Sequence, residues 1–354
     1  MKPDHYQTLM EQLDDDAALV TFEKISKNTS RGKPAEAATS RHRQPRNNLA
    51  PKKASAETTR FIRSQDDSFQ SFEFTYHAAR FEESWLLDSL GFFYEQHWIS
   101  DVVRKVKAGK EASVYLCRSG PQVETPLVAA KVYWPRMLRN LKNDQLYREG
   151  RAVLDETGHP IVDLGMLKAQ HKRSVYGEQI RHQSWLAHEF YTLQALFEAG
   201  ADVPRPYEMA PKAILMGYLG DETLPAPLLS EVTLETREAE QLFARILRNL
   251  HLMLSGGCVH GDLSAYNILY WKGNIALIDF PQVVPVRGNR NAYAIFERDM
   301  TRLCDYFIDQ GLSLQPGSLA ADLWTAHGYR IKPEVDPRLL DAEDPRDRLL
   351  WKEK

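Results

Sequence analysis

The feature that most constrains the fold of this chain is a pair of short apolar segments with acidic and amide residues just outside them. Segments 268–270 and 275–278 are separated by a glycine-containing turn, a pattern that predicts a β-hairpin. Asp262 and Asn267 lie five residues apart in the loop that leads into the first segment, and Asp279 follows the second. A hairpin brings its two outer ends together, so we expect Asn267 and Asp279 to converge, with Asp262 in the adjoining loop.

This set of side chains suits phosphoryl transfer from a nucleotide–metal complex. Mg²⁺ prefers hard oxygen ligands and keeps several waters, so Asn267 and Asp279 together with phosphate oxygens would suffice to hold it. Asp262 would orient or deprotonate the attacking hydroxyl. The alternative is a polar turn in which Asp279 caps a helix. The order of acid, amide, hairpin and acid is much rarer than any one of these residues and favours the catalytic interpretation.

An upstream segment, residues 102–117, has the pattern of two strands joined by a turn of small residues. In a nucleotide-binding hairpin the main-chain N–H groups of such a turn lie over the phosphates. Only one glycine is present, so an ordinary β-hairpin stays an alternative. The candidate nucleotide-binding residues in this segment are Gly109, Lys110, Glu111, Ser113 and Val114.

Lys131 lies within the apolar, β-rich run 127–133, where a lysine is costly to bury unless it is paired with an anion. We expect it to bind phosphate and to pair with Glu189, on a helix predicted for 185–199 with Ser184 as its cap. A lysine that reaches solvent from an edge strand and an exposed helix glutamate are the alternatives. The buried strand 213–219 would then become a hinge, with Met216 and Tyr218 lining a base pocket.

The overall composition is that of a soluble globular protein. The chain has 43% hydrophobic and 26% charged residues and a net charge of −3. No apolar run reaches the length of a membrane span, and the N-terminal residues lack the layout of a secretory signal. Cys117, Cys258 and Cys304 are far apart and lack metal-binding spacing. We therefore expect a cytoplasmic protein with reduced cysteines.

The first 70 residues are predicted to be a disordered basic extension. Between residues 24 and 63 there are eleven Lys or Arg against two Asp or Glu, with few large apolar residues. The alternatives are a solvated tail without a specific site and an arm that binds ribosomal RNA or a pre-ribosomal subunit through its phosphates.

The remaining pattern predicts two lobes, 71–217 and 218–354. The first would hold a leading helix over 78–93, the sheet, the Lys131 strand and the Glu189 helix, interrupted by a charged insertion over 134–181. The second would hold an amphipathic helix over 236–254, the catalytic loop, the metal-binding segment and a helix over 296–310.

These motifs resemble those of the RIO family of atypical kinases, in its type-1-like branch and with a composition that suggests a bacterial member. His260-Gly261-Asp262 and Asp279-Phe280-Pro281 stand where protein kinases carry H-R-D and D-F-G. The segments that carry the resemblance are Gly109–Tyr115, Lys131–Tyr133, Pro225–Leu229 and His260–Asn267. Only about 75 residues follow Asp279, and none reads as the A-P-E segment of protein kinases.

The resemblance implies an α+β, bilobal protein-kinase-like fold with a trimmed C-lobe, preceded by the basic arm. It implies binding of ATP with Mg²⁺ (or Mn²⁺), transfer of the γ-phosphate to Ser or Thr, autophosphorylation, or an ATPase switch in small-subunit ribosome maturation. Asp279 is then also a candidate phosphate acceptor. One rival is a small-molecule phosphotransferase of the aminoglycoside type, which predicts a deep acidic acceptor pocket after Asp279. Another is an ATP-gated, non-catalytic scaffold on ribosomal RNA.

Overall fold

The structure, a computed structural model, describes residues 72–109, 111–134, 149–171 and 174–331. The expected basic extension, Lys110, most of the first half of the charged insertion and the C-terminal tail lie outside the described residues. All described residues belong to one of two units of the chain, Ser68–Lys354.

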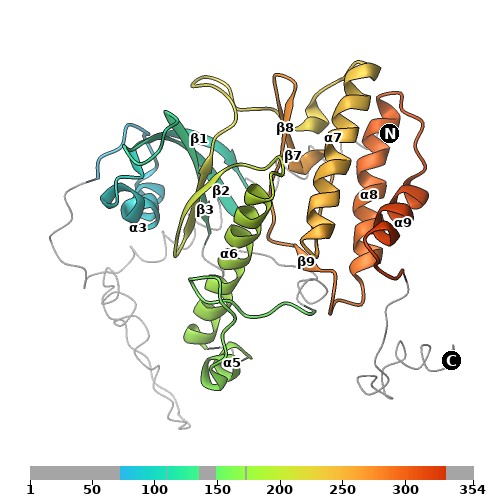
Figure 1. Cartoon of the computed structure of the whole chain (residues 1–354). Coiled ribbons are helices and arrows are strands. Elements are labelled where there is room, and N and C mark those ends of the chain that lie inside the picture. Colours follow the sequence, from blue (N-terminus) through green and yellow to red (C-terminus); the bar gives the residue numbers. More distant parts are fainter. Residues whose placement is uncertain (1–71, 110, 135–148, 172–173, 332–354) are drawn as a thin grey trace, which may run out of the picture. The chain divides into compact units, whose positions relative to one another are not determined.

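A five-stranded antiparallel sheet forms the first half of this unit (Figure 1). Its strands are β1 (Ile99–Ala108), β2 (Ala112–Ser119), β3 (Leu127–Tyr133), β4 (Pro206–Ala210) and β5 (Ala213–Gly217), in the order β1-β2-β3-β5-β4. The register places Lys131 of β3 between Val114 of β2 and Ile214 of β5. The hairpin and the lysine strand predicted from alternating apolar residues are therefore present.

The two faces of the sheet are covered by different helices. Side chains alternate along β3, so Val128, Ala130 and Val132 pack with α3 (Arg80–Glu95), while Tyr133 packs with α6 (Val175–Glu198) on the other face. Figure 1 shows the strands between these two helices. The sheet face that carries Lys131 is thus the one that faces α6.

The helix that carries Glu189 starts earlier than the sequence pattern predicted. It begins at Val175, where the Ser174 hydroxyl caps it by accepting a hydrogen bond from Gly177 N at 3.1 Å. Ser184, the expected cap, lies buried inside the helix, and its Oγ accepts a hydrogen bond from Leu154 N at 2.9 Å. Phe197, near the C-terminal end of the helix, is 40% exposed. A mid-helix serine that bonds to a neighbouring segment looks like a cap in sequence alone.

The expected insertion contains an unpredicted helix, α5 (Leu164–His171), which packs against α6. Its sequence has no clear apolar stripe, so the 3.6-residue period that reveals an amphipathic helix is missing. The side chains of Val162 and Leu164 are largely exposed.

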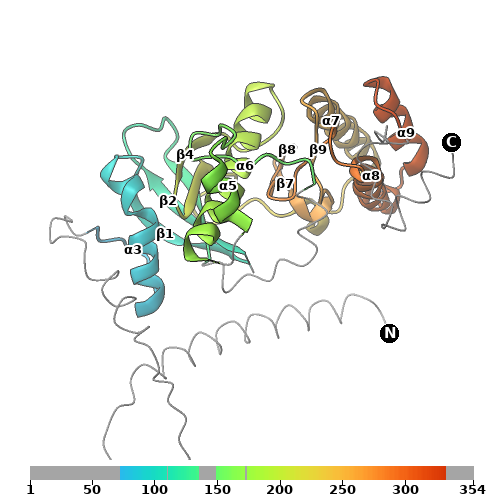
Figure 2. The ribbon, with the colours of Figure 1, turned by 90° about the horizontal axis from the view of Figure 1, so that it is seen from below.

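The second half of the unit is helical, with the predicted hairpin at its edge towards the sheet (Figure 2). The hairpin is β7 (Ile268–Trp271) and β8 (Asn274–Leu277), and it shares one core with the helices. These helices are α7 (Thr236–Ser255), α8 (Ala292–Asp309) and the unpredicted α9 (Pro316–Ala326). Two residue pairs, Cys258–Pro285 and Val259–Val284, join β6 (Cys258–Val259) to β9 (Val284–Pro285).

A partly buried polar cluster fixes the hairpin against α7. Arg245 of α7 forms an ion pair with Asp202 at 2.6 Å and donates to Asn274 in the hairpin turn at 3.1 Å. Leu277 N donates to Asp202 O at 2.8 Å, and the fully buried Asn249 donates to the Asp202 carboxylate. The strand that leads to Asp279 is therefore anchored at both of its ends, Asn274 and Leu277.

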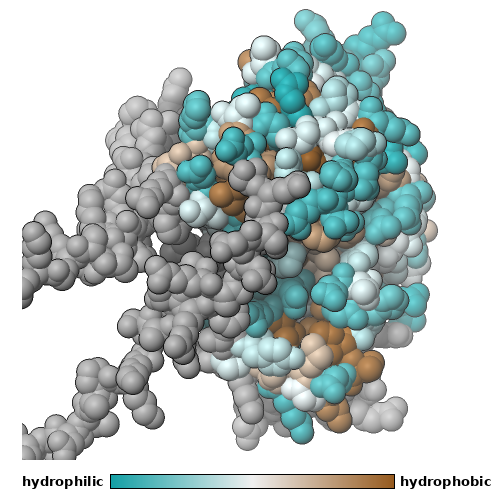
Figure 3. Space-filling view, turned by 90° about the vertical axis from the view of Figure 1, so that its left-hand side faces the viewer, coloured by the Kyte–Doolittle hydropathy of each residue, from teal (hydrophilic) through white to brown (hydrophobic). Residues whose placement is uncertain are grey.

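The architecture confirms the expected α+β protein-kinase-like fold. The sequence placed the boundary between the lobes at 217/218; β5 ends at Gly217, and that boundary stays a prediction. None of the helices in the described ranges combines the length and apolar character of a membrane span. On the face seen in Figure 3, small groups of apolar residues lie among mostly hydrophilic ones.

Candidate active site

A cleft of about 720 Å³ lies between the sheet and the helical half, within the size range of small-molecule sites. Nine of the residues predicted from sequence line this one cleft, although they come from the whole length of the described chain. They are Gly109, Glu111, Val114, Lys131, Glu189, Met216, Tyr218, Asn267 and Asp279. Asp262 adjoins the cleft through its contacts with Asn267.

Of the predicted nucleotide-binding residues that the structure describes, Ser113 does not line the cleft. Lys110 lies outside the described residues. Ser113 is fully buried in β2 and does not line the cleft, because the side chains of Ala112 and Val114 on either side of it face that way. Any contact between Ser113 and a nucleotide would have to come from its main chain, and that contact stays a prediction.

The turn between β1 and β2 is held at its base rather than left open. Gly109 N donates to Ala112 O at 3.0 Å, and a Cβ at Gly109 would lie 2.8 Å from the same oxygen. The indole of Trp134 donates to Gly109 O at 2.9 Å and stacks on Trp85 of α3 at 4.3 Å between ring centroids. Trp134 therefore connects the turn to α3, a contact that no periodic pattern in the sequence reveals.

At the centre of the cleft Lys131 contacts two carboxylates. Its Nζ lies 2.6 Å from Glu189 Oε1 and 2.7 Å from Asp279 Oδ1. Glu189 is 3% exposed, whereas 44% of the Asp279 side chain is exposed to the cleft. The partnership of Lys131 with Glu189 was expected, and the additional contact with Asp279 joins the two halves of the structure.

The charges of this group are mutually dependent. Burial alone would lower the pKa of Lys131, but the carboxylates of Asp279 and Glu189 outweigh it and hold the pKa above its ordinary value. Burial would raise the pKa of Asp279, but the Lys131 ammonium outweighs it and the pKa is lowered. Lys131 and Asp279 are therefore both charged at neutral pH.

Tyr133 is a member of this group that the sequence analysis did not identify. Its hydroxyl donates to Glu189 Oε2 at 2.7 Å, so each oxygen of the Glu189 carboxylate has a partner. Tyr133 follows Lys131 by two residues on the same strand and so faces the same side of the sheet. That i, i+2 relation is the signal that could have identified it.

Substitution of Tyr133 by phenylalanine is expected to reduce the free energy of unfolding by about 1–3 kcal/mol, because it leaves a buried carboxylate oxygen without its donor. Chemical denaturation measures the change. Tyr176→Phe, at an exposed position, serves as the control and should change stability by less than about 0.5 kcal/mol. Equal stability of the Tyr133 variant and the wild type would contradict the importance of this hydrogen bond.

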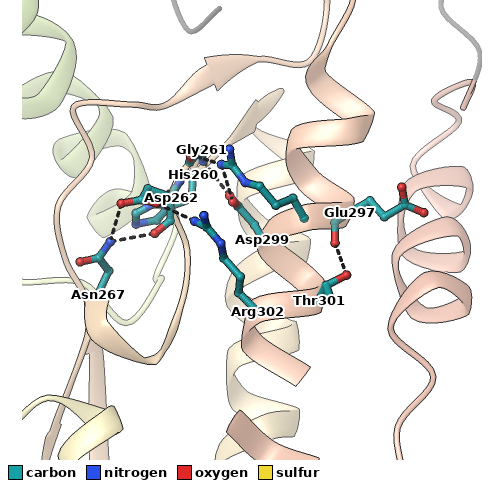
Figure 4. A network of polar contacts seen from close by, with 9 residues as sticks. His260, Gly261, Asp262, Asn267, Glu297, Asp299, Thr301 and Arg302 are labelled. Carbon is teal, nitrogen blue, oxygen red and sulfur yellow. Dashed lines mark hydrogen bonds and ion pairs between the residues drawn. The ribbon is translucent and has the colours of Figure 1, made fainter. Parts of the chain in front are cut away.

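Asp262 and Asn267 are arranged as a pair within the catalytic loop (Figure 4). Asn267 Nδ2 donates to Asp262 O at 2.7 Å and faces Asp262 Oδ2 at 3.4 Å. Because its nitrogen is engaged, the side-chain oxygen of Asn267 is the atom left for a cation. Asp262 Oδ1 accepts a hydrogen bond from Arg302 of α8 at 2.8 Å, a contact that the sequence did not predict.

His260 connects the catalytic loop to the strand that precedes Asp279. It is buried, its Nε2 lies 3.1 Å from Ile278 O, and its ring packs against Phe280. The tautomer that donates from Nε2 leaves Nδ1 to accept from Asp262 N, at 3.4 Å. One neutral tautomer thus serves both contacts.

Gly261 stands where protein kinases carry arginine, and the structure gives the reason. Its φ is +86°, and a Cβ there would lie 2.1 Å from Gln282 O. Its N–H donates to the buried carboxylate of Asp299 at 2.8 Å (Figure 4). Arg298 contacts the same carboxylate at 2.9 Å. Burial raises the pKa of Asp299 despite the opposing influence of the neighbouring His260 and Arg298.

Substitution of Gly261 by alanine is expected to lower stability by more than the strain of a left-handed residue, which is about 1–3 kcal/mol. The excess arises because the main chain at Gln282 must move. Gly273→Ala is the matched control, since its φ is +79° but no atom lies near its Cβ. Urea unfolding of both variants isolates the clash, and equal losses would contradict it.

The donor set at the cleft fits ATP with a divalent cation. Asp279 and Asn267 supply hard oxygen atoms, Lys131 supplies a buried positive charge, and all three line the same cleft. The main chain of the β1–β2 turn lines the cleft at Gly109. Among the described residues, no three His, Cys, Asp or Glu side chains cluster as a metal site.

Comparison with known proteins agrees with this geometry. Residues 161–317, which include Glu189 and the catalytic loop, match the family model of the RIO domain. The RIO-type serine/threonine-protein kinase Rio1 of Haloferax volcanii is 29% identical over 215 residues, covering 60% of this chain and 66% of that protein. The serine/threonine-protein kinase RIO1 of Chaetomium thermophilum is 31% identical over 228 residues, covering 60% of this chain and 40% of that protein.

A second branch of the same family also matches. The RIO-type serine/threonine-protein kinase Rio2 of Methanocaldococcus jannaschii is 35% identical over 134 residues, covering 36% of this chain and 48% of that protein. The chain thus spans less than two thirds of the length of each of these three relatives.

Proposed function

The chain carries a RIO domain and is related to RIO-type serine/threonine-protein kinases, and from this premise we propose that it transfers the γ-phosphate of ATP to a protein hydroxyl. The observation that carries the proposal is the convergence of Lys131, Glu189, Asn267 and Asp279 on one cleft with Asp262 at its edge. These are the residue types that kinase chemistry requires.

Each of these residues has a definite task in the proposed reaction. Lys131, already positively charged and oriented by Glu189, binds phosphate oxygens. Asn267 and Asp279 hold Mg²⁺ (or Mn²⁺), which when bound neutralises the charge that develops on the phosphates. Asp262 orients the acceptor hydroxyl and receives its proton. Met216 and Tyr218 line the part of the cleft expected to hold the base.

Arg302 has a consequence for how Asp262 acts. Arg302 Nη1 lies 2.8 Å from Asp262 Oδ1 and fixes the direction of the carboxylate, an arrangement suited to orienting a hydroxyl. A loose phosphoryl-transfer transition state needs little help from a strong base. The geometry therefore favours orientation as the main contribution of Asp262.

The charges near Asp262 favour a protein kinase over a small-molecule phosphotransferase of the aminoglycoside type. That rival predicts an acidic acceptor pocket after Asp279. In the described part of the chain, α8 instead directs Arg298 and Arg302 towards the catalytic loop. These two arginines are paired with Asp299 and Asp262, so the acids beside the catalytic loop are already engaged by cations of the chain itself.

The destination of labelled phosphate tests the proposal. Purified protein is incubated with Mg²⁺ and ATP labelled at the γ-phosphate, and the label is followed into protein, free phosphate and added metabolites. Acid-stable label on Ser or Thr is expected. Hydroxylamine-labile label would instead identify Asp279 as an acceptor in an ATPase cycle. Label in a metabolite alone, or none despite tight ATP binding, would contradict protein kinase activity.

We further propose a place in small-subunit ribosome maturation, with the basic extension as an RNA-binding arm. The local excess of positive charge between residues 24 and 63 supports this proposal. Binding to ribosomal RNA should weaken steeply with salt and be lost when residues 1–70 are removed. Unchanged binding after the truncation would contradict it.

A further inference from the structure

Residues 149–160, here called the strap, connect the Glu189 helix to the segment that follows Asp279. Three side chains of α6 hold the strap, and they lie at positions i, i+4 and i+7, on one face of the helix. The contacts are Leu154 N to Ser184 Oγ (2.9 Å), His188 Nε2 to Ala152 O (2.7 Å) and Tyr191 OH to Glu156 O (3.0 Å). Burial and the nearby Arg151 lower the pKa of His188 to about 4, so the neutral ring donates this bond.

The other side of the strap contacts residues 281–291. Gly150 approaches the main chain of Gly288 so closely that a Cβ at Gly150 would lie 2.7 Å from Gly288 O. The polar contacts are Arg151 Nη1 to Pro281 O (3.0 Å), Arg290 Nε to Glu149 Oε1 (3.3 Å) and Asn291 Nδ2 to Glu149 Oε2 (3.2 Å). Pro281 lies two residues after Asp279, so the strap reaches the metal-binding segment itself.

The strap is internally braced as well. Asp155 N donates to His159 O at 2.9 Å, and Ile161 N donates to Val153 O at 2.7 Å, which closes a tight loop. The Asp155 carboxylate accepts from Thr157 and from His159 N. A segment braced in this way keeps α6 and residues 281–291 at a fixed distance from each other.

Leu193 and Leu196 of α6 pack in the core of the helical half, and Asp202 bonds to the hairpin. The strap adds a link beside Asp279, where the ion pair with the sheet is temporary. Lys131 joins the sheet to Asp279 through a single ion pair. In the proposed reaction Lys131 turns to phosphate and Asp279 to the metal, so this contact is given up when the cleft is loaded. Among the described residues, none that forms a strap contact lines the cleft. The strap contacts can therefore persist when ATP and metal bind.

We propose that the strap holds Glu189 and Asp279 in a fixed relative position once ATP and metal occupy the cleft. Arg151 and His188 are then positioning residues for phosphoryl transfer. This inference rests on the proposed function. Glu189 stays oriented only while α6 stays fixed, and a displacement of about 1 Å at a reacting group can slow a reaction by about 10²-fold.

Arg151→Met tests the proposal, because it keeps an unbranched apolar stem and removes the donor to Pro281 O. We expect kcat to fall about 10- to 100-fold with a change in KM for ATP of less than about threefold. Arg237→Met, at an exposed position on α7, is the matched control and should leave kcat unchanged. If the Arg151 variant does not fold, Tyr191→Phe removes a strap contact from the other side.

A double-variant cycle separates positioning from general destabilisation. If Arg151 acts through Glu189, Arg151→Met should slow an enzyme that already carries Glu189→Gln by no more than about twofold. Its effect on the melting temperature should be the same in both backgrounds. An equal loss of kcat in the two backgrounds would overturn the proposal.

Hydrogen exchange gives a readout that does not depend on turnover. Amides of residues 184–191 and 281–291 are followed in the free protein and with Mg²⁺ and a non-hydrolysable ATP analogue. In the presence of the analogue, exchange should accelerate at least tenfold in both segments of the Arg151 variant and not in the control. Unchanged exchange in the Arg151 variant would overturn the proposed role of the strap, whether or not the wild type shows turnover. A wild type that neither transfers nor hydrolyses phosphate would separately refute the proposed function.

Discussion

Replacing Asp262 with alanine is expected to slow transfer of the γ-phosphate by on the order of 10²- to 10⁴-fold. Asp262 adjoins the cleft and contacts the proposed metal ligand Asn267, but it contacts neither Lys131 nor Asp279 in the structure. Affinity for ATP should therefore change by less than about tenfold. Single-turnover kinetics with labelled ATP, together with a fluorescence titration of nucleotide binding, measure the two effects separately.

The expected cost in stability is small, which makes this variant informative. The Asp262–Arg302 ion pair is about half exposed on each side, and pairs of this kind contribute about 1 kcal/mol or less. Asp305→Ala, an exposed aspartate on the same helix as Arg302, is the control and should transfer phosphate at the wild-type rate. A slow Asp262 variant that had also lost its fold would not support a catalytic role.

Replacing Asp279 with asparagine should have an effect of similar or greater size. The change keeps the shape of the side chain and removes the charge that would face the metal. A loss of about 4 kcal/mol of transition-state stabilisation corresponds to about 10³-fold in rate. Because the defect lies in metal binding, the Mg²⁺ concentration needed for half-maximal rate should rise as well.

A metal titration of the turnover rate separates this effect from the loss of the ion pair with Lys131. Lys131→Met removes the same ion pair and leaves Asp279 in place, so its metal dependence should stay close to that of the wild type. Asp309→Asn, exposed on α8, controls for loss of a charge elsewhere. Equal metal dependence of the wild type and Asp279→Asn would argue that Asp279 does not hold the metal.

Much of this site could be predicted from sequence because its residues are tied to strong local signals. The hairpin around the glycine turn fixes Asn267 and Asp279 at its two ends, and the apolar strand places Lys131 where only an anion can satisfy it. The order of lysine strand, helix and catalytic loop then identified Glu189. Each prediction needed only a periodic apolar pattern, a turn sequence or the free-energy cost of burying a charge.

The parts that escaped prediction depend on contacts between segments far apart in the chain. Arg302 meets Asp262 across 40 residues, and Ser184 meets Leu154 as part of the strap. The start of α6 was wrong because a serine inside the helix resembled a cap, and the true cap, Ser174, opens a stretch with little amphipathic pattern. Ser113 was placed at the cleft because a strand register cannot be read from one sequence.

The most direct test of the central claim is the initial rate of γ-phosphate loss from Mg²⁺–ATP by the wild type beside Asp262→Ala and Asp279→Asn. All three proteins are first shown to be folded and are compared at saturating nucleotide. We predict measurable turnover by the wild type and a loss of at least about 10²-fold in both variants. Turnover that survives in both variants, or tight ATP binding by the wild type without turnover, would contradict catalysis at this cleft.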